Sequence, residues 1–431
     1  MLERLFQLKA HNTTVRTEVL AGITTFLTMA YILFVNPNML AETGMDHGAV
    51  FVATCLAAAI GSLVMGLLAN YPIALAPGMG LNAFFTYTVV MTMGYSWQTA
   101  LGAVFLSGAI FFLLSIFRIR EWIINSIPLA LRAGIAAGIG LFLAIIALKN
   151  AGIVVDHPAT LVGLGDMSTG GALLACLGFF VIAALAYRKV TGAVMIGILL
   201  VTGLSIALGL SEMPSVVSMP PSLMPTLLQL DIAGALDIGL ISVIFAFLFV
   251  DLFDTAGTLV GVAQKANLLD KDGKMPRLGR ALLADSTATM AGAALGTSTT
   301  TSYIESAAGI SAGGRTGLTA CVVAALFLLS LFFAPLAGSV PAYAIAAPAL
   351  LFVAVLMMSS LAQIDWDDLT VAAPVVVAAL AMPLTFSIAN GIAFGFIAWT
   401  AVKVLAGRWR ELNPAMWVLS ALFIVKLAYF A

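Results

Sequence analysis

Three carboxylates lie inside long apolar stretches of the 431-residue chain: Asp251, Asp254 and Glu305. Ionisable side chains within a membrane segment are rare and mark binding sites or ion pathways. In the run FVDLFDTAGTLVGVA, polar side chains recur with helical spacing, i, i+3, i+4 and i+7, as Asp251, Asp254, Thr255 and Thr258. A helix would carry all four on one face, opposite Phe, Leu and Val. Such a face can hold a polar ligand or exchange a proton.

Each acidic residue also has a structural interpretation. A carboxylate at Asp254 can hold two helices together by hydrogen bonds, and the same alternative is open for Asp251, one turn nearer the outer side. Asp285, in LLADSTAT, follows a basic loop, a position typical of a helix cap or loop partner. We therefore expect Asp254 and Glu305 to carry the function, with Asp251 as a further candidate for proton coupling.

Two segments are too rich in glycine, proline and hydroxyl side chains to be ordinary spanning helices. They are YPIALAPGMGLNAFF at 71–85 and GTSTTTSYIESAAGISAGG at 296–314. Non-helical backbone at membrane depth is tolerated only where it is buried in protein or lines a cavity. Paired interruptions at matching places in two halves of a chain indicate a transporter binding site.

Each interrupted segment contains a polar candidate. Glu305 follows a Ser/Thr-rich run that suits an extended chain leading into a half-helix, whose free N–H groups favour an anion or a ligand acceptor nearby. Asn82 occupies the equivalent place in the first half, where the alternative is a helix cap. Phe84 and Phe85 come next; each ring could stack on a flat ligand or pack in the core.

One internal offset relates the two halves. Asp254 and Glu305 are 51 residues apart, as are Tyr31 and Asn82, so a shift of 223 residues superimposes both pairs. Tyr31 and Tyr303 complete the set of expected substrate-binding residues.

These residues together place carboxylates, a carboxamide, hydroxyls and backbone N–H groups in an apolar cavity. Such a set can read the edge of a planar, uncharged heterocycle. It lacks the buried Arg or Lys expected for a dicarboxylate or phosphate. Because burial favours the protonated form of a carboxyl, these groups can exchange protons near neutral pH, which fits proton coupling.

Composition shows what must position these residues. Hydrophobic residues make up 62% of the chain and charged residues 9%, against about 25% charged in soluble domains, so lipid must solvate most of the surface. We expect an all-α polytopic membrane protein with about fourteen spans, near 20–40, 50–69, 73–90, 100–117, 129–149, 171–188, 192–210, 237–263, 281–297, 300–313, 316–334, 341–360, 369–384 and 387–405. Residues 415–430 either span or lie at the interface.

The basic residues sort by side, as the positive-inside rule requires. With a cytoplasmic N-terminus, Lys and Arg fall in the inner segments, and Lys149 alone lies clearly outside. The inner loop 361–368 is the exception, with three Asp and no basic residue. The predicted organisation is a cytoplasmic N-terminus (1–17), a first repeat (18–210), an outer connection (211–236), a second repeat (237–406) and a C-terminal segment (407–431). Seven spans in each half make the repeats inverted.

Several long motifs carry a family resemblance. TTVRTEVLAGITTFLTMAYILFVNP, APGMGLNAFF, DLFDTAGTL, ADS, GTSTTTSYIESAAGISAGGRTGLTA and MPLTFSIANGIAFGF together cover nearly the whole chain. With them the sequence resembles the AzgA-like purine permeases, a branch of the nucleobase–cation symporter-2 (nucleobase–ascorbate transporter) superfamily.

The resemblance implies a core and a gate domain, with the third and tenth segments each beginning as a short strand, and the two strands meeting at the substrate site. It implies proton symport of purine bases such as adenine, guanine or hypoxanthine across a bacterial inner membrane, and often a homodimer. By motif, Asp254 takes the acidic position of the eighth segment, Glu305 the glutamate of the tenth and Asn82 the polar position of the third. Thr258 stands where some members have a histidine, and NAFF does not settle the preferred base.

Two other classes of membrane protein are alternatives to a proton-coupled purine symporter. An anion exchanger or channel shares the architecture, but carboxylates in the site would repel an anion. A membrane enzyme has no support, because the histidines lie in terminal or outer segments with no metal spacing. The expected partners are a purine base, a proton and the bilayer. No cofactor is expected beyond the proton as coupling ion. The net charge of −1 gives no global field that would favour nucleic acid.

Overall fold

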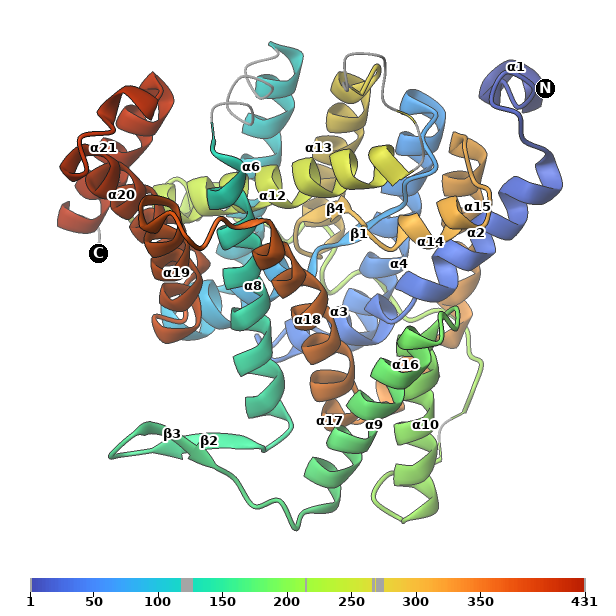
Figure 1. Ribbon diagram of the computed structural model, residues 1–431. Coiled ribbons are helices and arrows are strands. Elements are labelled where there is room, and N and C mark those ends of the chain that lie inside the picture. The colour runs from blue at the N-terminus through green and yellow to red at the C-terminus, as the bar shows by residue number, and fades with distance from the viewer. Residues whose placement is uncertain (1, 118–126, 214, 266–267, 269–274, 430–431) are drawn as a thin grey trace.

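The computed structural model describes residues 2–117, 127–213, 215–265, 268 and 275–429 (Figure 1). Four of the basic residues in the predicted inner segments, Arg118, Arg120, Lys271 and Lys274, lie outside this part of the chain.

The first half is helical apart from three short strands. Its elements are α1 (Leu2–Phe6), α2 (Val15–Met29), α3 (Ile32–Ala41), α4 (His47–Val64), η1 (Met65–Ala69), β1 (Leu75–Pro77), α5 (Met79–Ala83), η2 (Phe84–Thr92), α6 (Trp97–Ile116), α8 (Leu129–Asn150), β2 (Val154–His157), β3 (Leu161–Leu164), α9 (Gly170–Tyr187) and α10 (Ala193–Ala207).

The second half repeats the order of helix, helix, strand and half-helix. Its elements are α11 (Ile232–Ala235), α12 (Ile238–Lys265), α13 (Leu278–Leu295), β4 (Thr300–Ser302), α14 (Ser306–Ser311), α15 (Gly317–Ser330), η3 (Leu331–Phe333), α16 (Ala334–Ser339), α17 (Ala342–Ile345), η4 (Ala346–Leu351), α18 (Phe352–Met358), η5 (Ser359–Gln363), α19 (Leu369–Leu384), α20 (Ile388–Leu405), η6 (Trp409–Glu411) and α21 (Pro414–Tyr429).

Eight helical stretches in the described residues are long and apolar enough to cross a membrane, and four further apolar helices are shorter. Their starts follow capping chemistry, because Ser, Thr and Asp side chains accept the free N–H groups of a first turn. Caps of this kind open α2, α4, α6, α9, α15, α19 and α20, through Thr14, Asp46, Ser96, Thr169, Thr316, Asp368 and Ser387.

The two interrupted segments meet at the centre of the fold. β1 pairs antiparallel with β4, in the register Leu75↔Ser302, Ala76↔Thr301 and Pro77↔Thr300 (Figure 1). One further bond at each end extends the ladder, from Gly78 N to Thr299 O at 2.9 Å and from Tyr303 N to Ala74 O at 3.0 Å. Each of the two interrupted segments, 71–85 and 296–314, therefore contains a short strand as predicted, and the two strands pair.

A second antiparallel pair was not predicted. β2 and β3 form a hairpin after α8, at the bottom of Figure 1, with His157 opposite Leu161. The expectation of strands in the third and tenth segments alone was incomplete. The signal was the β-branched run before His157 and Pro158, which favours a strand followed by a turn.

Backbone contacts sort the helix ends onto two faces. The connection 211–236 donates backbone hydrogen bonds to the carbonyls of Gln98 at the start of α6, Ala294 at the end of α13 and Phe332 in η3, which follows α15. On the opposite face, Asn70 accepts from Gly317 N at 2.7 Å and donates to Phe6 O at 3.1 Å. The connection and the N-terminal helix therefore lie on opposite sides of the molecule.

The C-terminal helix α21 runs back along α20. The Thr400 and Ser420 hydroxyls lie 2.7 Å apart, and Lys426 Nζ donates to Asn390 Oδ1 at 3.0 Å. Residue numbers rise along α21 from Ser420 to Lys426, while those of their partners on α20 fall from Thr400 to Asn390, so the two helices are antiparallel. Within the segment 415–430, for which the sequence allowed either a span or an interfacial position, the described residues belong to helix α21 (Pro414–Tyr429), which lies beside α20.

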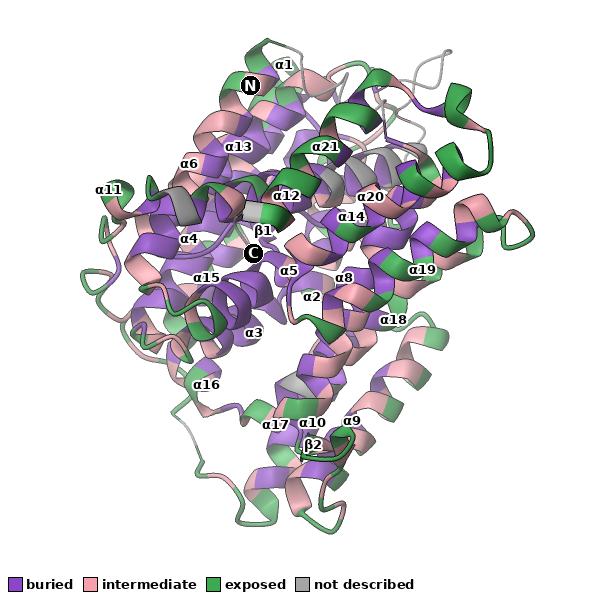
Figure 2. Cartoon of the chain, turned by 90° about the vertical axis from the view of Figure 1, so that its left-hand side faces the viewer, coloured by how far each residue is buried: buried purple, intermediate pink, exposed green. Residues whose placement is uncertain are grey.

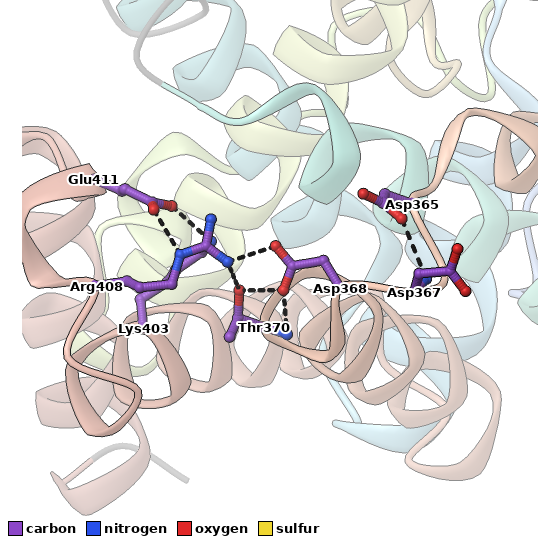
Figure 3. A network of polar contacts seen from close by, with 7 residues as sticks. All are labelled: Asp365, Asp367, Asp368, Thr370, Lys403, Arg408 and Glu411. Carbon is purple, nitrogen blue, oxygen red and sulfur yellow. Dashed lines mark hydrogen bonds and ion pairs between the residues drawn. The ribbon is translucent and has the colours of Figure 1, made fainter.

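The basic partner of the acidic loop before α19 comes from elsewhere in the sequence (Figure 3). Arg408, after α20, contacts Asp368 at 2.5 Å and Glu411 at 2.5 Å, and Lys403 contacts Glu411 at 2.7 Å. Hydrogen bonds from Thr370 and Arg408 lower the pKa of Asp368 to about 2, so this carboxylate is charged at neutral pH. The network joins the start of α19 to the end of α20 on one side.

Burial follows the pattern expected for a protein solvated by lipid (Figure 2). Buried residues gather around α3, α4, α13 and α15, while α9, α19 and α21 carry exposed residues on their outer faces. Large apolar side chains are among those exposed, such as Phe180 on α9 and Leu384 on α19, at 64% and 75%. Exposing so much apolar surface to water would be unfavourable, whereas lipid acyl chains can cover it without that cost.

Candidate functional site

Glu305 stands at the entry to a half-helix, as the sequence predicted. It is the residue before α14 and is half-buried. The Tyr31 hydroxyl, from the break between α2 and α3, donates to Glu305 Oε1 at 2.6 Å, and Thr28 Oγ1 lies 3.4 Å from the Glu305 carbonyl. Tyr31 is buried, so the break in the first helix orients the carboxylate of the second half.

Asp254 contacts β4, the strand that precedes Glu305 in the chain. The Thr301 hydroxyl of β4 lies 3.4 Å from Asp254 Oδ2, and Thr301 itself is buried. Asp254 is half-buried, like Glu305. β4 therefore connects the two predicted carboxylates: its Thr301 contacts Asp254, and its chain continues into Glu305.

Asn82 points its amide at the second interrupted segment. It is fully buried inside α5, and its Oδ1 accepts a hydrogen bond from the Ser298 hydroxyl. Its Nδ2 group has no hydrogen-bond partner among the described residues. The helix-cap alternative is wrong, because Gly78 is the cap of α5 and no side-chain cap bond is present. An unpartnered buried amide donor is costly unless a ligand or water satisfies it.

The polar stripe of α12 divides between two neighbours. Asp254 faces β4, whereas Thr255 Oγ1 lies 3.0 and 3.1 Å from the two carboxyl oxygens of Asp285 and 3.3 Å from Asp251 Oδ1. Ser302 Oγ of β4 is 3.4 Å from Asp285 Oδ1. The expectation that Asp285 is a cap or loop partner is wrong. It is fully buried within α13, and the cap position belongs to Arg277.

The remaining predicted residues lie near this centre in different roles. Thr258 is buried and forms no hydrogen bond with the described part of the chain. The Tyr303 hydroxyl donates to Pro77 O at 2.6 Å, joining the two strands. The Phe84 ring is buried and packs edge to face on Phe247, with centroids 5.0 Å apart. The packing interpretation therefore describes Phe84 in this structure.

The buried amide of Asn36 was not predicted from the sequence. Asn36 in α3 donates to Thr54 Oγ1 at 2.7 Å and to Thr297 Oγ1 at 2.8 Å, and its Oδ1 has no partner among the described residues. Thr297 begins the Ser/Thr-rich run, so Asn36 anchors the second interrupted segment to the first half. The available signal was an Asn directly before Pro37 within an apolar span.

Comparison with known proteins agrees with this architecture. The Permease family matches residues 16–394. The chain belongs to this family. The AzgA-like resemblance within the nucleobase–cation symporter-2 superfamily is confirmed by the relatives of this permease.

Two relatives align along the full permease. It is 52% identical over 429 residues to the adenine permease AdeP of Escherichia coli (strain K12), covering 100% of this chain and 96% of that protein. It is 47% identical over 441 residues to the guanine/hypoxanthine permease PbuG of Bacillus subtilis (strain 168), covering 100% and 99%. The protein is therefore a multi-pass membrane transporter and not an enzyme.

The fold has relatives of more distant sequence. The transmembrane domain of the cyanobacterial bicarbonate transporter BicA superimposes with a TM-score of 0.66 at 16% identity, over 87% of this chain and 96% of that one. At that identity the likeness concerns the fold alone, and the site residues must be interpreted from this chain.

Proposed function

We propose that this permease takes up purine nucleobases together with protons, by alternating access around Asp254 and Glu305. The observation that supports this most is a pair of half-buried carboxyls, Asp254 bonded to Thr301 of β4 and Glu305 just after that strand, together with the unpartnered Asn82 amide on the segment that pairs with it. The names of the relatives support the substrate class, since adenine and guanine/hypoxanthine permeases align over the whole chain.

The polar groups complement the edge of a purine. A carboxylate accepts N–H bonds, and a free amide N–H donates to a ring nitrogen or an exocyclic oxygen. Glu305 and Asp254 supply acceptors and Asn82 supplies the donor. Hydroxyls contact all three: Thr301 and Ser298 of the second interrupted segment contact Asp254 and Asn82, and Tyr31, between α2 and α3, contacts Glu305. An uncharged base fits this set better than an anion, which two carboxylates would repel.

The carboxyl pair supports proton coupling. Two carboxyls in an apolar site do not both ionise readily, and their titration belongs to the pair. A proton on the pair removes a buried charge, and a bound base satisfies the remaining hydrogen bonds. The loaded carrier then reorients at lower cost than the half-loaded one. The Asp251–Thr255–Asp285 contacts, directly behind Asp254 on α12, provide a further route for that proton.

The proposal includes the finer architecture. Fourteen membrane segments form two inverted repeats, with α2–α6 and α12–α15 as the core and α8–α10 and α17–α20 as the gate. The antiparallel pairing of β1 with β4 and the gathering of helix ends on two faces support it. We place the N-terminus in the cytoplasm and the protein in a bacterial inner membrane, on the sorting of basic residues. A homodimer remains part of the proposal.

Uptake tests this function directly. Cells lacking their own purine carriers would express the permease and receive labelled adenine, guanine or hypoxanthine, with and without a protonophore. We expect accumulation of at least one base and its loss with the protonophore. Accumulation that persists without a proton gradient would disprove the coupling. Uptake of bicarbonate or sulfate but of no base would move the protein to the anion carriers.

A further inference from the structure

An apolar cavity of about 490 Å³ lies between α6, α12, α20 and α21. Its walls are aliphatic and aromatic, with Leu114, Phe249, Ile392 and Leu422 among them. Neither Glu305 nor Asp254 lines it, so it is separate from the proposed transport site. Its volume falls in the range of about 300–1,000 Å³ that is usual for ligand pockets.

The cavity borders the surface that faces lipid. Residues of α12 and α21 both line it and are exposed on the outside, such as Phe245 at 47% and Leu422 at 59%. Acyl chains surround these helices in a bilayer. An acyl chain is therefore the apolar molecule that can enter and fill this space.

One charged residue interrupts this apolar lining. Lys426 is the only ionisable side chain of the described residues that lines the cavity. Its ammonium donates to Asn390 Oδ1 at 3.0 Å, a neutral acceptor, and forms no ion pair within the described part of the chain. An ammonium has three donors, so a half-buried Lys426 lacks a counter-charge.

The other end of the same helix pair shows the contrast (Figure 3). There Lys403 and Arg408 both contact Glu411, and Arg408 also contacts Asp368. Because α21 runs antiparallel to α20, Lys426 lies at the opposite end of the pair, beside the start of α20. Carboxylates thus neutralise one end, while the other presents a cation above an apolar cavity.

We propose that this cavity binds one anionic glycerophospholipid, with an acyl chain between the four helices and the phosphate on Lys426. The apolar walls match the chain, and the phosphate supplies the missing counter-charge. Intramembrane and interfacial cations that lack a protein partner commonly contact lipid headgroups. The site does not depend on which substrate the permease carries.

Native mass spectrometry of the full-length, delipidated protein tests this site. The protein would be titrated with phosphatidylglycerol or with phosphatidylcholine of identical acyl chains. We expect one tightly bound phosphatidylglycerol per chain, with about a fivefold preference over phosphatidylcholine, as one basic residue near a lipid headgroup provides. Lys426→Gln and Lys426→Met should both remove this preference, and Lys426→Arg should keep it. Lys9→Gln, at the exposed N-terminus, is the matched control.

A second variant tests the cavity itself. Ala389→Leu places bulk in the lining and should weaken both lipids while the Lys426 preference persists. Equal phosphatidylglycerol affinity in wild type and in both neutral Lys426 variants would overturn the headgroup contact. Unchanged lipid binding in Ala389→Leu would overturn the cavity assignment. Loss of a two-chain complex in that variant, with lipid binding intact, would assign the groove to a second copy of the protein instead.

Discussion

The two interrupted segments share one backbone arrangement and differ in chemistry. In the first half, β1 leads into α5 and then the long π-helix η2, and all residues from Leu75 to Val89 are buried or nearly so. In the second half, β4 leads into the six-residue α14, and its strand is built wholly from hydroxyl residues. The first half contributes one neutral amide, Asn82, and the second contributes the carboxylate Glu305.

This difference in chemistry indicates that the two interrupted segments have different roles. A neutral amide can be fully buried at modest cost if it is hydrogen-bonded, whereas a carboxylate needs several donors or partial access. Asn82 is fully buried with its Oδ1 bonded to Ser298 and its Nδ2 left for a ligand, whereas Glu305 and Asp254 are half-buried with hydroxyl partners. We therefore expect changes in the second half to affect binding and coupling strongly, and changes in the first half to affect the choice of base.

The largest effect is expected for Glu305→Gln. The substitution removes a charge and one acceptor, so N–H groups of the bound base lose a partner in a dry site. That loss costs about 1–3 kcal/mol, roughly 5–150-fold in affinity. Uptake of labelled base, normalised to membrane expression, measures it. Glu42→Gln is the control, because Glu42 accepts from Tyr87 away from the site. Wild-type uptake by the glutamine variant would remove Glu305 from the site.

Asp254→Asn should separate binding from accumulation. The amide cannot ionise, so the variant should lose uptake against a gradient even where it still binds base. Thermal shift measures the binding, and proteoliposomes with an imposed pH gradient measure the transport. Asp166→Asn, in the exposed loop before α9, is the matched control. If the asparagine variant still concentrates base, Asp251 or Glu305 must carry the proton without Asp254.

Asn82→Ala should have a smaller effect on uptake than either acidic change and a larger one on selectivity. The amide provides both a donor and an acceptor, and these distinguish purines by their edge groups. Inhibition of uptake by adenine, guanine and hypoxanthine measures the change, with Asn38→Ala as control, since Asn38 bonds only within α3. An unaltered inhibition profile would mean that Asn82 only holds Ser298.

The smallest effect is expected for Tyr31→Phe, which removes one of several hydrogen bonds between the halves, the one to Glu305. Losing one hydrogen bond costs about 0.5–1.5 kcal/mol, or roughly two- to tenfold in apparent affinity, while the Glu305 carboxyl group stays in place. The apparent Km for uptake measures it. Tyr87→Phe is the matched control, because its hydroxyl contacts Glu42 and Asn150 instead. A loss as large as that of Glu305→Gln would show that Tyr31 itself contacts the base.

The sequence alone determined the class of protein and the positions of the two interrupted segments. Hydropathy identified a membrane protein, because lipid and water select composition residue by residue. Local breaks at 71–85 and 296–314 identified both interrupted segments, since glycine, proline and hydroxyl residues disfavour a continuous spanning helix. The i, i+3, i+4 spacing placed the α12 carboxylates and hydroxyls on one stripe, which the structure divides between β4 and α13.

Only the tertiary structure decided which polar groups meet. Tyr31 reaches Glu305 across 274 residues, and Ser298 reaches Asn82 across 216. Asp285 looked like a loop partner from its neighbours in sequence but is buried against Thr255 and Ser302. The β1–β4 pairing was expected from the family resemblance and from no local pattern. Contacts of this kind depend on how separate helices and strands pack, and residue type and periodicity describe only one element at a time.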